Sequence, residues 1–160
     1  KILGSREEID ILDFGCGTGD KIAYFTKNGA EFVYGIDINP AAILTAENKL
    51  KKLNVHYELR EVINYNHMNK FLNNLKKKKF DLVVLDRVLY ILSNNDLFKL
   101  LNIFSKISNY IYIDDFFLVN VHTNFNQVLK NFLFKPIYKS KTPYPKVKFA
   151  NAQAALYKKL

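Results

Sequence analysis

Residues 11–19 read Ile-Leu-Asp-Phe-Gly-Cys-Gly-Thr-Gly, and this stretch decides the fold. Its apolar start has the length and flanks of a buried parallel strand. Gly15, Gly17 and Gly19 follow at alternate positions, and an amphipathic helix is expected from about Thr18. A strand, a glycine loop and a helix in this order let a backbone approach a ligand without interference from a Cβ atom, and they aim free N–H groups at it. The stretch therefore predicts a ligand-binding loop.

The length and composition suit one globular domain. A chain of 160 residues is long enough to bury a proper core. No apolar run approaches the ~20 residues that are needed to cross a bilayer. The start at Lys1 has neither a Met nor a signal-peptide pattern, so we expect further native residues, such as N-terminal helices, upstream. A single cysteine excludes an internal disulfide and suits a reducing cytoplasm.

The net charge of +9 is spread unevenly along the chain. All acidic residues lie at or before Asp115, whereas the part from Phe116 onward holds only lysines as charged residues. This asymmetry favours an anionic substrate, such as RNA or a phosphorylated metabolite. Alternatively, the excess of lysines reflects overall composition and not a ligand, because Lys and Asn are common throughout the chain, as in chains encoded by AT-rich genomes.

Strand and helix patterns alternate along the chain, which predicts a parallel sheet with right-handed crossovers. Ligands of such sheets lie beyond the carboxyl ends of the strands. Strands are expected at 9–14, 31–37, 55–59, 80–85, 110–114, 136–141 and 154–159, and helices at about 18–28, 40–53, 67–78, 94–107 and 122–134.

The loop differs from both common phosphate-binding patterns. It lacks the Gly-x-Gly-x-x-Gly spacing of dinucleotide sites and the Lys-Ser/Thr of phosphate loops. Asp13, the glycines and Cys16 between them instead resemble the first motif of the class I methyltransferases that use S-adenosyl-L-methionine (SAM). The resemblance implies one domain over residues 1–160 with a Rossmann-like, doubly wound, mostly parallel α/β sheet. Its implied strand order is 3-2-1-4-5-7-6, with one antiparallel strand and helices on both faces.

Further residues extend the resemblance along the predicted strand ends. Asp37 ends the second strand, where a carboxylate can accept hydrogen bonds from both hydroxyls of a ribose. The surrounding Gly-Ile-Asp-Ile-Asn-Pro resembles the family's second motif, which implies that Asp37 and Ile38 contact the cofactor. Alternatively, Asp37 is a solvated strand-end acid or a helix N-cap. After the third strand, Glu61 and Val62 stand where the family meets the adenine, unless the register shifts toward Asn64-Tyr65.

Residues 80–92 resemble the fourth-strand motif of the family's small-molecule branch. The resemblance places Leu85 and Asp86 under the methionine part of the cofactor, and Asp81 is expected to fix the strand entrance. Asp86 could alternatively pair with Arg87 or cap a turn. The chain lacks the Asn/Asp-Pro-Pro-Tyr/Phe motif of enzymes that methylate amines of nucleic-acid bases, which argues against that reaction on DNA.

Candidate catalytic groups follow the fourth and fifth strands. The Asp114-Asp115 pair is expected at the end of the fifth strand, where Asp115 either acts as a base with a raised pKa or caps the next helix. His122 is the other candidate base, and Tyr90 is a candidate for the acceptor pocket. The three histidines lack the spacing of metal ligands, so no metal site is expected.

The sequence therefore predicts an enzyme that transfers a methyl group from SAM by in-line displacement. The expected acceptor is a small, anionic or hydroxyl-bearing metabolite or sugar. A second hypothesis is RNA methylation through the basic run at 139–148, whose lysines are interleaved with Tyr138 and Tyr144. A third is a non-catalytic binding domain with the same fold.

Overall fold

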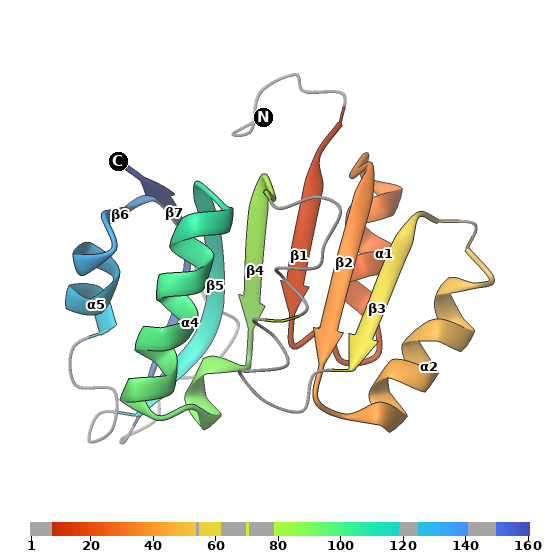
Figure 1. The fold of residues 1–160 in the computed structure, drawn as a ribbon, viewed down its shortest axis with the longest axis horizontal. Coiled ribbons are helices and arrows are strands. Elements are labelled where there is room, and N and C mark those ends of the chain that lie inside the picture. Colours follow the sequence, from red (N-terminus) through yellow and green to blue (C-terminus); the bar gives the residue numbers. More distant parts are fainter. Residues whose placement is uncertain (1–7, 54, 62–69, 71–78, 119–124, 141–149) are drawn as a thin grey trace. The chain divides into compact units, whose positions relative to one another are not determined.

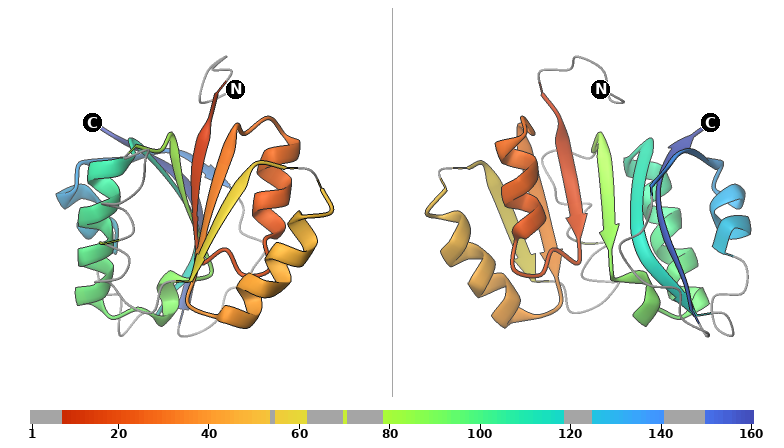
Figure 2. Two further views of the ribbon diagram at one scale, coloured as in Figure 1. Left: turned by 45° about the vertical axis from the view of Figure 1, so that its right-hand side comes forward. Right: turned by 180° about the vertical axis from the view of Figure 1, so that it is seen from behind.

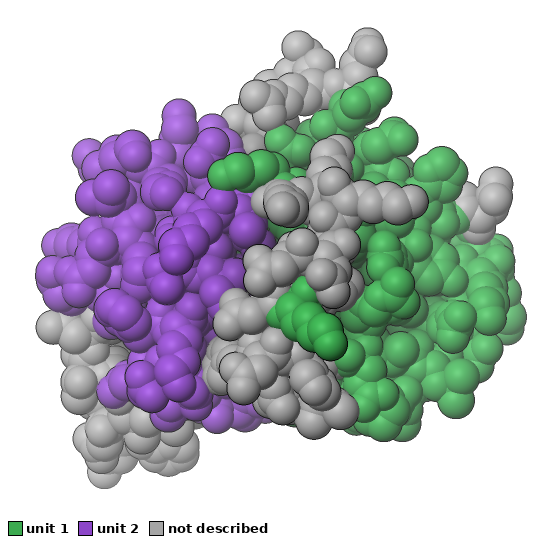
Figure 3. Space-filling view, in the orientation of Figure 1, with its two compact units in different colours: residues 1–83 green, residues 84–160 purple. Residues whose placement is uncertain are grey.

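The computed structural model describes residues 8–53, 55–61, 70, 79–118, 125–140 and 150–160 (Figure 1). The strands of this part form a sheet in the order β3-β2-β1-β4-β5-β7-β6, which confirms the predicted order. The chain divides into two compact units, residues 1–83 and 84–160 (Figure 3). The strands are β1 (Asp10–Phe14), β2 (Phe32–Asp37), β3 (Tyr57–Glu61), β4 (Leu82–Asp86), β5 (Tyr110–Leu118), β6 (Phe134–Ser140) and β7 (Ala150–Lys159).

In the first unit, β1, β2 and β3 are parallel neighbours, and two helices cover one of their faces (Figure 2). The helices are α1 (Asp20–Lys27) and α2 (Pro40–Leu50). Aliphatic side chains of these strands and helices form the core, among them Leu12, Ile22 and Leu50, which are fully buried. The entrance to β4 is fixed as expected, because the Asp81 carboxylate accepts the Asp10 N–H at 2.9 Å.

Helix α2 begins where the sequence predicts and ends three residues earlier than predicted. The Asn39 side chain accepts the N–H groups of Ala41 and Ala42, and Pro40 occupies the first helical position, where its missing N–H costs nothing. After Leu50 the bonds change to the i→i−3 type, with Leu53 N–H donating to Leu50. The chain therefore leaves the helix through a tighter turn.

In the second unit, the antiparallel strand β7 pairs with β5 and with β6. The helix α4 (Asn94–Ile107) has the predicted bounds, and its apolar face is buried. The Ser93 hydroxyl caps α4 by accepting the Asp96 N–H at 3.1 Å, and it donates to the Asp96 carboxylate at 2.7 Å. The other elements of this unit are the short 3-10 helix η1 (Leu89–Ile91) and the helix α5 (Phe125–Asn131).

Several predicted bounds are wrong for reasons of tertiary pairing. Strand β3 lies two residues later than predicted, in register with the end of β2. Strand β5 continues to Leu118 because β7 pairs with it along nine residues, so Asp114 and Asp115 lie inside the strand and not at its end. Phe134 starts β6 and does not end a helix. The predicted helix at 67–78 lies outside the described residues except for position 70.

The helices of the described part are all too short or too polar to span a membrane.

Candidate functional site

The glycine loop follows β1 and is tied to the end of β2. Gly15, Gly17 and Gly19 have φ angles of 79°, 52° and 77°, in the left-handed region that glycine adopts without steric cost. The N–H groups of Gly15 and Cys16 both donate to the Ile36 carbonyl, at 2.7 and 3.0 Å. These bonds hold the loop at the carboxyl edge of the parallel strands, where ligands of such sheets bind.

Gly17 and Gly19 serve different purposes in this loop. A Cβ atom at Gly19 would lie 3.1 Å from the Ala46 Cβ and 3.2 Å from the Leu50 Cδ1, so this glycine lets α2 pack against the loop. A Cβ atom at Gly17 would have no neighbour within 4 Å among the described residues. Gly17 thus presents its backbone to open space, as a loop must if a ligand is to lie against it.

The Asp37 carboxylate contacts this loop directly. Its Oδ2 accepts the Gly17 N–H at 2.8 Å, and its Oδ1 accepts the Asn39 N–H at 2.9 Å. A carboxylate oxygen can accept more than one hydrogen bond, so both oxygens can take a further donor from a ligand. The N-cap of α2 is Asn39, so the alternative role of Asp37 as the helix cap is wrong.

Two of the other predicted cofactor residues of the first unit border Asp37. Glu61 is exposed at the end of β3 and stands directly beside Asp37 in the strand register. Ile38 follows Asp37 in the chain and is 63% exposed, which is unusual for a large apolar side chain. Asp13 is buried in β1, where it pairs with Gly35 of β2. Val62 lies outside the described residues.

Cys16 is buried, and its thiol is held in the protonated form. Burial raises the pKa of its thiol far above the ordinary value, and the nearby carboxylates of Asp13 and Asp37 act in the same direction. The thiolate is the nucleophilic form of cysteine, so a thiol held protonated is a poor nucleophile. The side chain acts as a small apolar residue within the loop.

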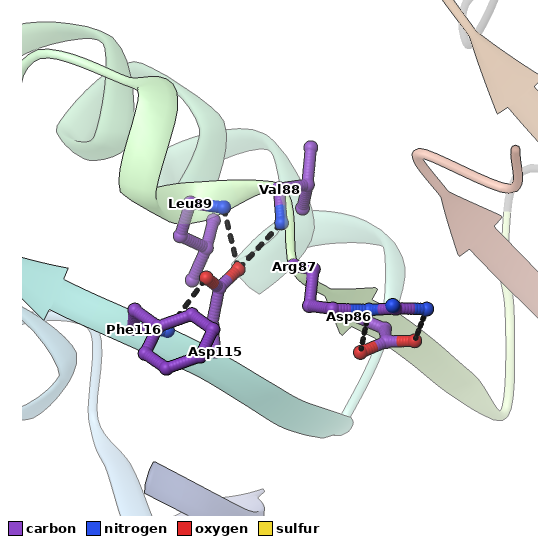
Figure 4. Close-up of polar contacts among 6 residues, drawn as sticks. All are labelled: Asp86, Arg87, Val88, Leu89, Asp115 and Phe116. Atoms are coloured by element: carbon purple, nitrogen blue, oxygen red, sulfur yellow. Dashed lines mark hydrogen bonds and ion pairs between the residues drawn. The ribbon is translucent and has the colours of Figure 1, made fainter. Parts of the chain in front are cut away.

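The end of β4 carries the predicted residues of the second unit. Leu85 is fully buried. Asp86, the last residue of β4, forms an ion pair with Arg87, in which Nε lies 3.4 Å from Oδ1 and Nη2 lies 3.4 Å from Oδ2 (Figure 4). This is the alternative role that the sequence suggested for Asp86. Contact with a cofactor stays a prediction for both residues.

Asp115 lies elsewhere than the sequence suggested. Its side chain is fully buried inside β5, and it accepts N–H bonds from Val88 and Leu89, both at 2.6 Å, and from Phe116 at 2.7 Å (Figure 4). The pKa of Asp115 is raised above its ordinary value because burial disfavours the charged form, and the backbone N–H groups offset only part of this effect. No sequence signal indicates this arrangement, because two of the three donors, Val88 and Leu89, lie more than twenty positions away from Asp115.

The remaining acceptor-side candidates are Tyr90 and His122. The Tyr90 ring is 42% exposed and packs edge to face against Phe116, with 6.5 Å between the ring centroids. This aromatic pair can present an apolar surface to an acceptor. His122 lies outside the described residues, so its role as a base stays a prediction.

Comparison with known proteins identifies the family. Residues 5–157 match the family model described as a methyltransferase domain, so the chain belongs to that family. The strand order and the glycine loop are those of the class I, SAM-dependent methyltransferases with a Rossmann-like fold. This family was the one expected from the loop residues.

Individual relatives are distant or cover only part of the chain. The ribosomal protein L11 methyltransferase of Thermosipho africanus is 32% identical over 79 residues, which are 49% of this chain and 27% of that protein. A SAM-dependent methyltransferase from Clostridium acetobutylicum has a TM-score of 0.75 at 16% identity, over 99% of this chain and 86% of that one. Magnesium protoporphyrin IX methyltransferase from Synechocystis, with bound SAM, has a TM-score of 0.72 at 16% identity, over 98% and 73%. At these identities the solved structures show a common fold.

Proposed function

We propose that this chain binds SAM and transfers its methyl group to an acceptor by in-line displacement. The observation that carries the proposal is the contact between Asp37 and the Gly17 N–H at the end of β2. It places a carboxylate beside an open backbone surface, which suits a ribose whose two hydroxyls donate hydrogen bonds. A carboxylate here would repel a 2′-phosphate, so a ribose with free hydroxyls is preferred.

The residues of the first unit that would hold the cofactor lie at the ends of β1, β2 and β3. Asp37 would bind the ribose, and the glycine loop would lie along the methionine-bearing part of the ligand. Glu61, beside Asp37, would accept the adenine amine, and the exposed Ile38 would pack on the ring. We also propose that Leu85 and Asp86 contact the methionine part of the cofactor. SAM supplies an activated methyl group on a sulfonium, so the protein chiefly aligns the reactants and excludes water.

Calorimetry with SAM tests this proposal. We expect binding by the wild type and, in the Asp37→Ala variant, a loss of at least tenfold, or about 1.4 kcal/mol. The matched control is Glu47→Ala, which removes an acid from α2 that pairs with Lys51 at 3.2 Å. A wild type that gives no heat with SAM, or that binds NADH in preference, contradicts the proposal. Binding that is unaffected by Asp37→Ala contradicts the assigned ribose contact.

For the acceptor we propose a small metabolite with a carboxylate or phosphate oxygen. Asp115 is buried and its oxygens accept backbone N–H groups, which makes it a poor general base. An anionic oxygen acceptor needs no base, whereas a sugar or phenol hydroxyl gains from one. The net charge of +9 favours the approach of an anion.

The acceptor is tested by a screen that detects S-adenosylhomocysteine. Carboxylates and phosphorylated metabolites are expected to give product, and sugars, RNA and ribosomal protein L11 are the comparison groups. Ribosomal protein L11 belongs in the screen because one relative, 32% identical over part of this chain, is named as the methyltransferase of that protein. Turnover only with hydroxyl acceptors would contradict the proposal. Absence of turnover with every acceptor, despite SAM binding, would favour the non-catalytic alternative.

RNA is the second candidate acceptor because of the surface of β6. Lys135, Tyr138 and Lys139 are exposed on this strand, and Lys130 is exposed on α5. Lysines can meet phosphates and a tyrosine ring can stack on a base, in the manner of single-strand binding proteins. Lysines on an edge strand also prevent aggregation, which explains the same residues without a ligand. The rest of the basic run, at 141–148, lies outside the described residues.

Binding of single-stranded RNA at several salt concentrations separates these explanations. If RNA is the acceptor, affinity falls steeply with salt, and the double variant Lys135→Glu/Lys139→Glu weakens it. The control is Lys27→Glu, which makes the same lysine-to-glutamate change at the end of α1. It should have little effect on RNA affinity. Absence of binding at low salt would exclude this candidate.

A further inference from the structure

The strands β5, β7 and β6 of the second unit form a sheet with two different faces. One face packs against α4, because the Nζ of Lys159 in β7 donates to the Ser105 carbonyl of that helix at 2.6 Å. Tyr157 lies two positions earlier on the same face and is fully buried, as is Ile111, its partner in β5. Seen from behind, α4 lies on the far side of β5 and β7 (Figure 2). On the opposite face of the sheet, the tyrosines and lysines are exposed or partly exposed.

A first row of side chains crosses this second face and places two positive charges next to each other. Lys158 of β7 stands directly opposite Lys135 of β6, and both lysines are exposed. Like charges in directly opposite positions destabilise a sheet, so an anion that binds both lysines would stabilise it. On its other side, Lys158 faces Tyr110 of β5, and its Nζ lies over that ring at 5.8 Å from the centroid. This row therefore favours a negatively charged ligand.

The next row across the same face is aromatic. Tyr138 of β6 and Tyr112 of β5 stand on either side of Leu156 of β7. Tyr138 is 53% exposed, whereas Leu156 is only 9% exposed. An exposed tyrosine ring beside lysines is a surface on which a nucleobase can stack, at about 1–3 kcal/mol per base. Asp114 follows Tyr112 on this face, so the basic end of the face is the one that carries the first row.

We propose that this face binds single-stranded RNA, with phosphates at Lys135 and Lys158 and a base stacked on the Tyr138 ring. Phosphate supplies the anion that the paired lysines favour, and the base supplies a planar partner for the ring. Some RNA-binding modules hold unstacked bases in this way, on aromatic side chains of an open sheet. An acidic polypeptide would neutralise the lysines but would leave the ring without a planar partner. The inference goes beyond the proposed function, since RNA bound here need not accept the methyl group.

Fluorescence anisotropy provides the test, with a labelled oligouridine of about eight nucleotides, a length within the site sizes of single-strand binding folds. Tyr138→Leu removes the ring and should weaken binding about tenfold, whereas Tyr138→Phe keeps the ring and should bind within about twofold of the wild type. Lys135→Gln and Lys158→Gln should each reduce the slope of log affinity against log salt by about 0.7, the value for one phosphate contact of a single strand.

Lys139→Gln is the matched control for the charge. Lys139 is exposed on the same strand as Lys135, but it stands opposite Ala155, on the face that packs against α4. Its substitution should leave both the affinity and the salt dependence unchanged. Tyr24→Leu is the control for the ring, because Tyr24 is 63% exposed on α1. Circular dichroism of each variant checks that it is folded.

Several outcomes would overturn the inference. Equal losses in Lys135→Gln and Lys139→Gln would indicate diffuse attraction by the whole strand, and unchanged affinity in Tyr138→Leu would exclude base stacking. Inorganic polyphosphate that binds as tightly as the oligouridine would indicate that bases are not recognised, and polyglutamate that does so would favour an acidic polypeptide. Absence of RNA binding at low salt overturns the inference as well. A wild type that does not bind SAM contradicts the proposed function and leaves this inference unaffected.

Discussion

Gly35 and Gly17 lie close together in the first unit but are required for opposite reasons. A Cβ atom at Gly35 would lie 2.6 Å from the Ile22 Cδ1, 2.7 Å from the Leu59 Cδ2 and 2.9 Å from the Cys16 Sγ. All these distances are shorter than van der Waals contact. Gly35 therefore maintains the packing of α1 on β2, whereas Gly17 borders open space.

We expect Gly35→Ala to lower the free energy of unfolding by about 1–3 kcal/mol, because an added methyl group in a packed core displaces its neighbours. Urea denaturation followed by circular dichroism measures this change. Gly29→Ala measures the cost of backbone strain without a clash, since a Cβ atom there has no neighbour within 4 Å among the described residues but the φ angle is 93°. An unchanged unfolding midpoint in Gly35→Ala would show that the core accommodates the methyl group.

For Gly17→Ala the expected effect is on ligand binding. A methyl group at a φ of 52° strains the backbone by about 1–2 kcal/mol, and it projects into the space proposed for SAM. Calorimetry should show weaker binding than in Gly35→Ala, when both are measured at a temperature where they are folded. Full SAM affinity in Gly17→Ala would place the ligand elsewhere.

The reactivity of the Cys16 thiol tests whether this side chain is buried in the folded protein. Since its pKa is raised by burial and nearby carboxylates, the thiol should not react with a disulfide reagent at pH 8 while the protein is folded. The unfolded chain should react at the rate of an ordinary cysteine. Rapid modification of the native protein would show that the loop opens readily.

The residues that were predicted correctly are those whose role depends on local sequence. The glycine loop and the position of Asp37 at a strand end follow from a few adjacent residues, and the structure confirms both positions. The environment of Asp115 depends on Val88 and Leu89, which only the folded sheet brings close. A pair of acids in the sequence does not reveal such partners, so the sequence left open whether Asp115 acts as a base or as a cap.

At the level of elements, the start of α4 is the best-defined local structure. Ser93 and Asp96 are joined by two hydrogen bonds, in which the Ser93 hydroxyl accepts the Asp96 N–H as an N-cap does and donates to the Asp96 carboxylate. We expect Ser93→Ala to lower the free energy of unfolding by about 1 kcal/mol, because it leaves a helix N–H without its partner. Urea denaturation measures this, with Asn95→Ala as the control from the same turn. Equal stability of both variants would contradict the assigned cap.

The ends of some helices and strands are determined by the adjacent sequence, and those of others by pairing with distant segments. Helix α4 has both predicted ends, since its cap and its apolar period lie within the segment. The extent of β5 was underestimated because its last four residues pair with β7, more than thirty positions later. The extent of β5 therefore depends on pairing that its own segment does not reveal.

For the whole molecule, the proposed ligand should act on stability through mass action. A ligand that binds only the native state at 100 times its dissociation constant raises the free energy of unfolding by about 2.7 kcal/mol. We expect SAM to raise the thermal midpoint of the wild type and, at the same concentration, to stabilise Asp37→Ala by no more than about 1.4 kcal/mol, or about half as much, if affinity falls at least tenfold. A midpoint that rises equally in both proteins would indicate binding away from Asp37.

The strand order has a consequence for how the chain is synthesised. Strand β7 lies between β5 and β6, although both are made before it. On a ribosome, the first unit has β1, β2 and β3 available in succession, so these strands can pair while translation continues. Strands β5 and β6 must wait with exposed edges until residues 150–159 emerge. The second unit therefore completes its strand pairing only after its last strand has been made.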